Sequence, residues 1–142
     1  MVRSNDYVDK IGVSLKNVFK SFRDVLITTE NTDIDKKLEK YKCIILLNHI
    51  PSNDFNRLIN REIESVILNT GCYVIGNLKN RKYMVDVVDK MTQELYEGCD
   101  FDIETDTENI TYINYIYGYE SNPDDNNTIY FSGILKTEID FK

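Results

Sequence analysis

The sequence contains no alanine, no tryptophan and a single histidine among its 142 residues. It also lacks any apolar run near the eighteen residues that a membrane-spanning helix needs, and its first residues have no apolar core of a secretion signal. We therefore expect a cytoplasmic protein that does not enter a membrane. Asparagine, isoleucine, lysine and tyrosine are abundant instead. AT-rich codons encode these residues, so the composition favours an AT-rich genome, such as that of a bacterium, a mobile element or a large DNA virus.

The sequence also lacks the motifs that hold common cofactors. Three cysteines, Cys43, Cys72 and Cys99, have spacings that fit neither a disulfide framework nor a CxxC metal pair. We interpret them as small buried hydrophobic residues in a reducing compartment. A Walker loop, a dinucleotide-binding glycine fingerprint and the H-E-x-x-H zinc motif are all missing. We therefore predict no cofactor and no metal site.

Basic residues are missing from one long stretch of the chain. The net charge is −7, yet residues 1–90 carry 15 Lys and Arg against 12 Asp and Glu. Residues 91–135 carry ten acidic residues and no basic one. Such a charge argues against binding to phosphates of nucleic acid or to anionic membranes. We expect no direct nucleic-acid partner.

The length fits one globular domain over residues 1–142. Apolar residues at helical spacing predict helices at 4–22, 33–40, 53–71 and 80–98. Shorter apolar runs predict strands at 24–29, which also fits a frayed helix end, at 43–47 and at 72–75. The continuous run 43–47 suits a strand covered on both faces at the centre of a sheet.

From residue 99 the period of the pattern changes to two, which predicts antiparallel strands at 100–108, 110–119 and 129–139. The fold class we predict is a mixed α+β (α/β) domain. Its helices pack on a mixed sheet that ends in an antiparallel C-terminal meander. Helices and strands alternate over 1–98, and acidic strands follow over 99–142.

Five carboxylates recur at every second position of the segment 100–108. A strand there would place all five on one face, about 6.6 to 6.8 Å apart: Asp100, Asp102, Glu104, Asp106 and Glu108. Three interpretations stay open. The face is simply solvated, or it resembles a row of phosphates and occludes a basic surface, or it binds a divalent cation with ligands from another element.

Tyrosines concentrate beside these acids, and their amphipathic rings suit a protein-binding surface. The alternative is that they pack across neighbouring strands. With the carboxylates, the residues that we predict to bind a partner are Tyr115, Tyr117, Tyr119, Asp124 and Asp125.

His49 is the one candidate for catalysis. It follows the predicted strand 43–47, and ligands gather at the ends of such strands in open α/β sheets. His49 would act as a general base oriented by Asp54. The other interpretation is an ordinary polar loop residue.

We favour a protein without catalytic activity that binds a protein with a basic surface. An acidic inhibitor, an immunity-type protein or a nucleic-acid mimic is the concrete form of this hypothesis. One alternative is a small hydrolase or transferase with its site around His49. Another is a structural subunit of a larger assembly that pairs through a sheet edge. The sequence leaves the partner and the oligomeric state open.

Overall fold

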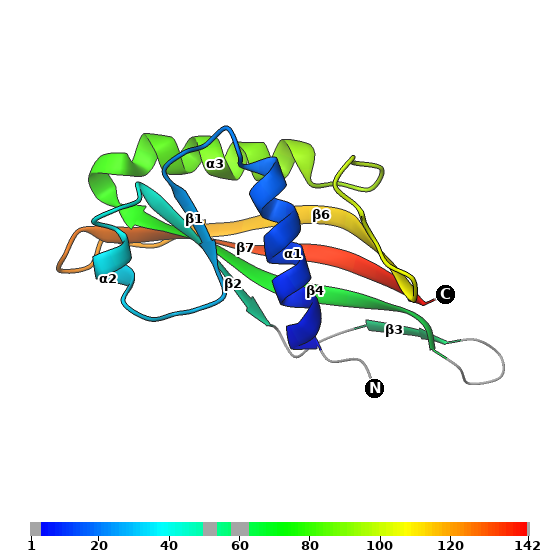
Figure 1. Ribbon diagram of the computed structural model, residues 1–142. Coiled ribbons are helices and arrows are strands. Elements are labelled where there is room, and N and C mark those ends of the chain that lie inside the picture. The colour runs from blue at the N-terminus through cyan, green and yellow to red at the C-terminus, as the bar shows by residue number, and fades with distance from the viewer. Residues whose placement is uncertain (1–3, 50–53, 58–62, 142) are drawn as a thin grey trace.

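The structure is a computed structural model that describes residues 4–49, 54–57 and 63–141 (Figure 1). Its elements in chain order are α1 (Ser4–Val18), β1 (Val25–Thr28), α2 (Ile34–Lys37), β2 (Cys43–His49), β3 (Asp54–Arg57), β4 (Ile63–Asn77), a 3-10 turn (Leu78–Asn80), α3 (Arg81–Glu94), β5 (Ile103–Glu104), β6 (Glu108–Glu120) and β7 (Thr128–Phe141). The mixed α+β architecture is therefore confirmed.

The described strands form one mixed sheet in the order β1-β2-β4-β7-β6-β5. β1 and β2 are parallel, and the other pairs are antiparallel. β3 pairs with the first part of β4, on the side where β2 pairs with its second part. The predicted strand 43–47 is buried on both faces. It lies next to the edge strand β1, however, and the centre of the sheet is the long pair of β4 and β7.

The helix predicted over 53–71 is wrong. Residues 54–57 form β3, residues 63–77 form β4, and residues 58–62 lie outside the described part of the chain. In β4 every second residue is buried: Val66, Leu68, Thr70, Cys72 and Val74. The apolar residues here fit both a period of 3.6 and a period of two. Strand pairing on both sides of β4, together with its many β-branched residues, decides the outcome.

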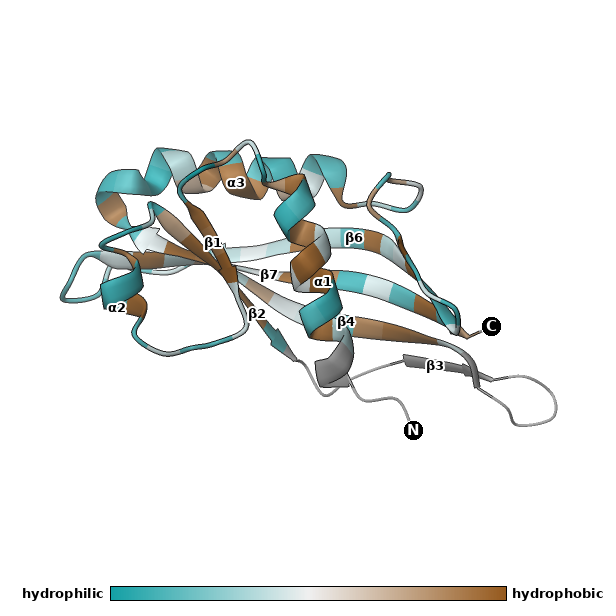
Figure 2. Cartoon of the chain, in the orientation of Figure 1, coloured by the Kyte–Doolittle hydropathy of each residue, from teal (hydrophilic) through white to brown (hydrophobic). Residues whose placement is uncertain are grey.

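Two helices cover the same face of the sheet. In Figure 1, α1 crosses in front of the strands and α3 lies along their upper side. Both helices contribute to one hydrophobic core, with Ile11 and Leu15 from α1 and Met84 and Met91 from α3 fully buried. Figure 2 shows hydrophobic residues in β1, β2 and β4 and in patches of both helices. The predicted apolar faces of these two helices are therefore confirmed.

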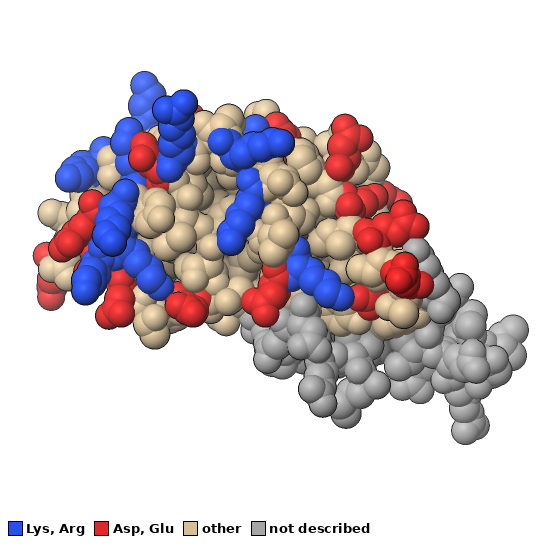
Figure 3. Space-filling view, in the orientation of Figure 1, with Lys and Arg blue, Asp and Glu red and all other residues tan. Residues whose placement is uncertain are grey.

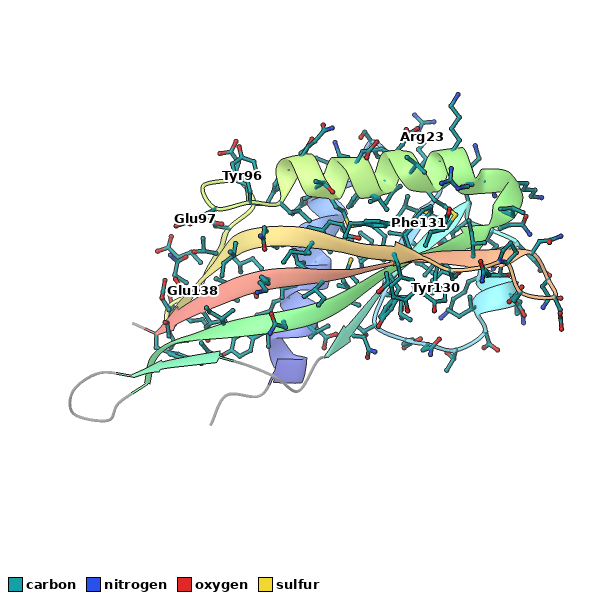
Figure 4. The ribbon with its side chains drawn as sticks, turned by 180° about the vertical axis from the view of Figure 1, so that it is seen from behind. Arg23, Tyr96, Glu97, Tyr130, Phe131 and Glu138 are labelled. Carbon is teal, nitrogen blue, oxygen red and sulfur yellow. The ribbon has the colours of Figure 1, made fainter. Side chains whose placement is uncertain are left out.

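The opposite face of the sheet is seen in Figure 4, where β4, β7 and β6 lie in front of α1. Its exposed residues include Ile116, Tyr119 and Ile134. Within the part of the chain that the structure describes, no helix has the length and apolarity to cross a membrane.

Candidate functional site

The segment 100–108 does not form the single strand that its alternating pattern predicts. β5 consists of Ile103 and Glu104 alone and pairs with Asn109 and Ile110 of β6. The reason is a turn between the two strands. The Thr105 N–H donates to the Glu108 carbonyl at 2.9 Å, and the Glu108 N–H donates to Thr105 Oγ1 at 3.1 Å. The prediction of five carboxylates on one strand face is therefore wrong.

Glu108 belongs to the interior of the fold. Its carboxylate accepts a hydrogen bond from the Tyr7 hydroxyl and another from Lys10 Nζ, both at 2.7 Å, and both donors come from α1. Burial disfavours the charged carboxylate, but the hydrogen bonds from Lys10 and Tyr7 and the charge of Lys10 outweigh that effect and lower the pKa of Glu108. Glu108 thus ties β6 to α1 and is not exposed to a partner.

The other carboxylates of the segment remain exposed and lie close together in the chain. Asp100, Asp102, Glu104 and Asp106, with the nearby Glu97, form what we call the acidic end. Figure 3 shows acidic side chains gathered at this end of the molecule. On the face shown, most Lys and Arg side chains lie toward the opposite end, mixed with other acidic residues.

A groove of about 510 Å³ is lined by residues of α1 on one side and of the acidic segment on the other, and we call it the acidic groove. Ser14 Oγ donates a hydrogen bond of 2.9 Å to the Phe101 carbonyl and so fixes the acidic segment against α1. The groove is lined by Lys10, Val13, Ser14, Asn17, Asp100, Phe101, Asp102, Ile103, Glu104 and Thr105. Three of these residues are acidic, while the Lys10 ammonium is bonded to Glu108. The groove therefore has an excess of negative charge.

The predicted tyrosines do not form one surface. Tyr115 is buried over Gly133, and burial raises the pKa of its hydroxyl. The register of β6 against β7 shifts between Tyr117 and Tyr119. Tyr117 contacts the Phe131 ring, whereas Tyr119 contacts the Tyr130 ring. Because Tyr130 and Phe131 are neighbours on one strand, Tyr117 and Tyr119 point to opposite faces of the sheet.

The predicted aspartates of the turn lie at the far end of β6 from the acidic end. β6 has 13 residues, which corresponds to a length of about 40 Å. Asp124 Oδ1 accepts the N–H groups of Asn126 and Thr128, both at 2.8 Å. Asp124 therefore shapes the turn between β6 and β7, and Asp125 is exposed beside it. These two residues do not join the acidic end.

The candidate catalytic residues are placed by their backbone alone. His49 is the last residue of β2 and Asp54 is the first residue of β3. Their side chains and residues 50–53 lie outside the described part of the structure. The described residues include no cluster of three His, Cys, Asp or Glu side chains suited to a metal ion.

Sequence reasoning did not find the contribution of α1 to the site. Lys10 and Ser14 precede the acidic segment by about 90 residues, and no local pattern connects them to it. The helical spacing of apolar residues did predict α1 and its buried face, which carries Tyr7. It did not predict that this face contacts the acidic segment. Comparison with known proteins adds no relative, because no family model and no curated protein sequence matches this chain.

Proposed function

We propose that this protein binds a partner protein with a basic surface, and that the acidic end is the docking site. The observation that carries the proposal is the charge of the acidic groove. Its lining includes three carboxylates and one lysine, Lys10, which is already bonded to Glu108. A lysine or arginine of the partner would complement the excess of negative charge in the groove.

The groove suits a long basic side chain in a second respect. Val13 lies at its wall with 62% of its surface exposed, and Phe101 contributes apolar area. Lysine and arginine place their methylene stems on apolar surface and keep their charged ends near polar groups. A basic side chain would therefore find both of its contacts in the groove.

Clustered charge of one sign also raises the rate at which an oppositely charged partner associates. The finer form of the proposal is an inhibitor or nucleic-acid mimic that occludes a nucleic-acid-binding site of its partner.

The three free, buried cysteines support action in a reducing compartment, which we propose to be the cytoplasm.

The test is a pull-down from lysate of the native host with the tagged protein at low and high salt, followed by mass spectrometry. The proposal expects a basic protein that is retained at low salt and released at high salt. The variant carries Glu97→Lys, Asp100→Lys and Asp106→Lys, three exposed positions of the acidic end. Its affinity for the retained partner should fall by on the order of tenfold or more.

A matched control changes net charge by the same amount at the other end of the molecule. It carries Asp35→Lys, Glu39→Lys and Asp125→Lys, which are also exposed. The proposal expects this control to keep most of the affinity. Equal losses in both variants would show that net charge, and not the acidic end, determines binding. Retention of no basic partner would contradict the proposal.

A further inference from the structure

The strand β6 has an open edge over its second half. On the side away from β7, β5 pairs with Asn109 and Ile110, and Tyr96 forms a bridge with Asn114. For residues 115–120, the described part of the chain provides pairing partners in β7 alone. On either side of the register shift between Tyr117 and Tyr119, the N–H and C=O groups that do not bond to β7 therefore point outward, as at a sheet edge.

Few charged side chains lie along this edge: Glu120 is the one charged residue of 115–120, and it forms an ion pair with Arg81. Residues 111–119 include no charged residue. Large apolar side chains are exposed instead: Ile116 at 42%, Tyr117 at 45% and Tyr119 at 56%. Tyr117 faces α3, and Ile116 lies on the opposite face together with the exposed Ile134. An added strand would thus meet apolar surface on both of its faces.

A groove of about 320 Å³ lies between this edge and α3, and we call it the α3–β6 groove. Its lining consists of Arg81, Val85, Val88, Asp89, Thr92, Tyr117 and Phe131. The Tyr117 and Phe131 rings are 6.2 Å apart, and the Arg81 guanidinium lies 5.8 Å from the centre of the Phe131 ring. The volume is at the small end of the range of about 300–1,000 Å³ for ligand pockets, which suits side chains of a peptide.

The charges of the groove indicate which peptide it would accept. Arg81 forms an ion pair with Glu120 at one end of the groove. Asp89 takes part in none of the ion pairs found among the described residues. The charge left uncompensated in the groove is therefore negative, and a lysine or arginine of the ligand complements it.

We propose that the α3–β6 groove binds an extended peptide segment of another protein, which adds to β6 as a further strand. Every second side chain of the segment is apolar and enters the groove between Tyr117 and Val88, and a basic side chain reaches Asp89. Main-chain hydrogen bonds to residues 115–120 supply affinity, and the groove supplies specificity. This inference goes beyond the proposed function, because the groove shares no residue with the acidic end. Figure 4 shows Phe131 and Glu97 at opposite ends of the sheet.

The test selects ligands for the full chain from a phage-displayed library of random linear peptides and measures the affinity of synthetic peptides by fluorescence anisotropy. The selected peptides should alternate apolar residues with others and carry a lysine or arginine. Tyr117→Arg should weaken binding at least tenfold. Leu78→Arg, at an exposed apolar position outside both surfaces, should leave it unchanged.

Two further comparisons test whether Asp89 binds the basic side chain of the peptide and whether the peptide pairs with β6 as a strand. Asp89→Lys should lower the affinity for the basic peptides. Asp86→Lys, on the same helix but outside the groove, should leave that affinity unchanged. N-methylation of alternate peptide amides should abolish binding in one register and spare it in the other, since alternate N–H groups of an added strand face β6.

Three results would overturn the inference. One is a selection that enriches no peptide over a parallel selection on Tyr117→Arg. Another is a set of peptides that tolerates N-methylation in both registers. The third is a set that loses affinity with the triple variant of the acidic end but not with Tyr117→Arg. This last result would support the proposed function while excluding the groove, so the two proposals fail separately.

Discussion

Glu108→Gln is expected to destabilise the fold and to change its response to acid. The Glu108 side chain is 8% exposed and joins β6 to α1 through Tyr7 and Lys10, each at 2.7 Å. Glutamine keeps an oxygen that can accept from the Tyr7 hydroxyl. It loses the negative charge, and with it the charge-assisted bond from Lys10.

The magnitude follows from the exposure of the two partners. A hydrogen bond to a charged group contributes about 1.5–3 kcal/mol. Lys10 is 41% exposed, so water can solvate its ammonium once the carboxylate is gone. That screening places the loss in the free energy of unfolding near the lower end, at about 1–2 kcal/mol. The partly buried pair of Lys90 and Glu94 lies one helical turn apart on α3, so Glu94→Gln should cost about 0.3–0.5 kcal/mol.

The pH dependence has a defined sign. The pKa of Glu108 in the folded protein lies below its ordinary value of 4.5. A depressed pKa contributes stability that is fully present above the unfolded value and is lost as pH falls through the folded pKa. The gap in unfolding free energy between wild type and Glu108→Gln should therefore be constant above about pH 4.5 and shrink in acid.

The assay is urea denaturation followed by far-ultraviolet circular dichroism, from about pH 7 down to about pH 3. Comparison of wild type with the variant at each pH removes the contributions of the other carboxylates, which titrate in both proteins. Two results would refute the reasoning. One is a loss no larger than that of Glu94→Gln, and the other is a gap that does not change in acid.

Four further predictions concern the core. The Thr137 hydroxyl is fully buried with no hydrogen-bond partner in the described structure, so Thr137→Val should raise the free energy of unfolding by about 1 kcal/mol; a loss of stability in urea would contradict this. A Cβ at Gly133 would overlap the Tyr115 ring, so Gly133→Ala should destabilise by about 1–3 kcal/mol. Gly12→Ala in α1, where the added Cβ would make an ordinary contact of 3.5 Å with Leu47, should instead stabilise by about 0.5–1 kcal/mol in the same urea denaturation experiments. Cys72 is fully buried and burial raises its pKa to about 12, so iodoacetamide should modify this thiol only when the fold opens; rapid labelling of the native protein would refute this.

The elements that the sequence predicted well are those in which one period dominates. In α1 and α3, apolar residues recur every three or four positions, and the structure buries Leu15 and Met91 on those faces. In β7, alternate residues from Ile129 to Ile139 are buried, as the period of two predicts. Local sequence was sufficient here because each element buries one face against a single core.

The segment 54–71 was mispredicted because its local pattern fits two structures, whereas the strand predicted directly after it lies within β4. The spacing of Phe55, Val66 and Ile67 matches a helix, and the sequence gives no sign of the neighbours that β4 has on both sides. Those neighbours lie far away in the chain, since Val66 pairs with Ile139. Tertiary pairing therefore overrides the local preference.

In the acidic segment, the amino-acid composition predicted where negative charge gathers, but the alternating pattern did not predict which carboxylates are exposed. The excess of negative charge over residues 91–135 can be counted from the sequence, and the acidic end is where much of it lies. Whether one carboxylate is exposed depends instead on donors elsewhere. Asp106 and Glu108 are two residues apart and equivalent in the alternating pattern, yet Asp106 is exposed in the turn and Glu108 is buried. The difference is Lys10 and Tyr7, about 100 residues away, whose hydrogen bonds offset the cost of burying Glu108. The surface that we propose for a basic partner therefore consists of those carboxylates that the tertiary fold leaves exposed.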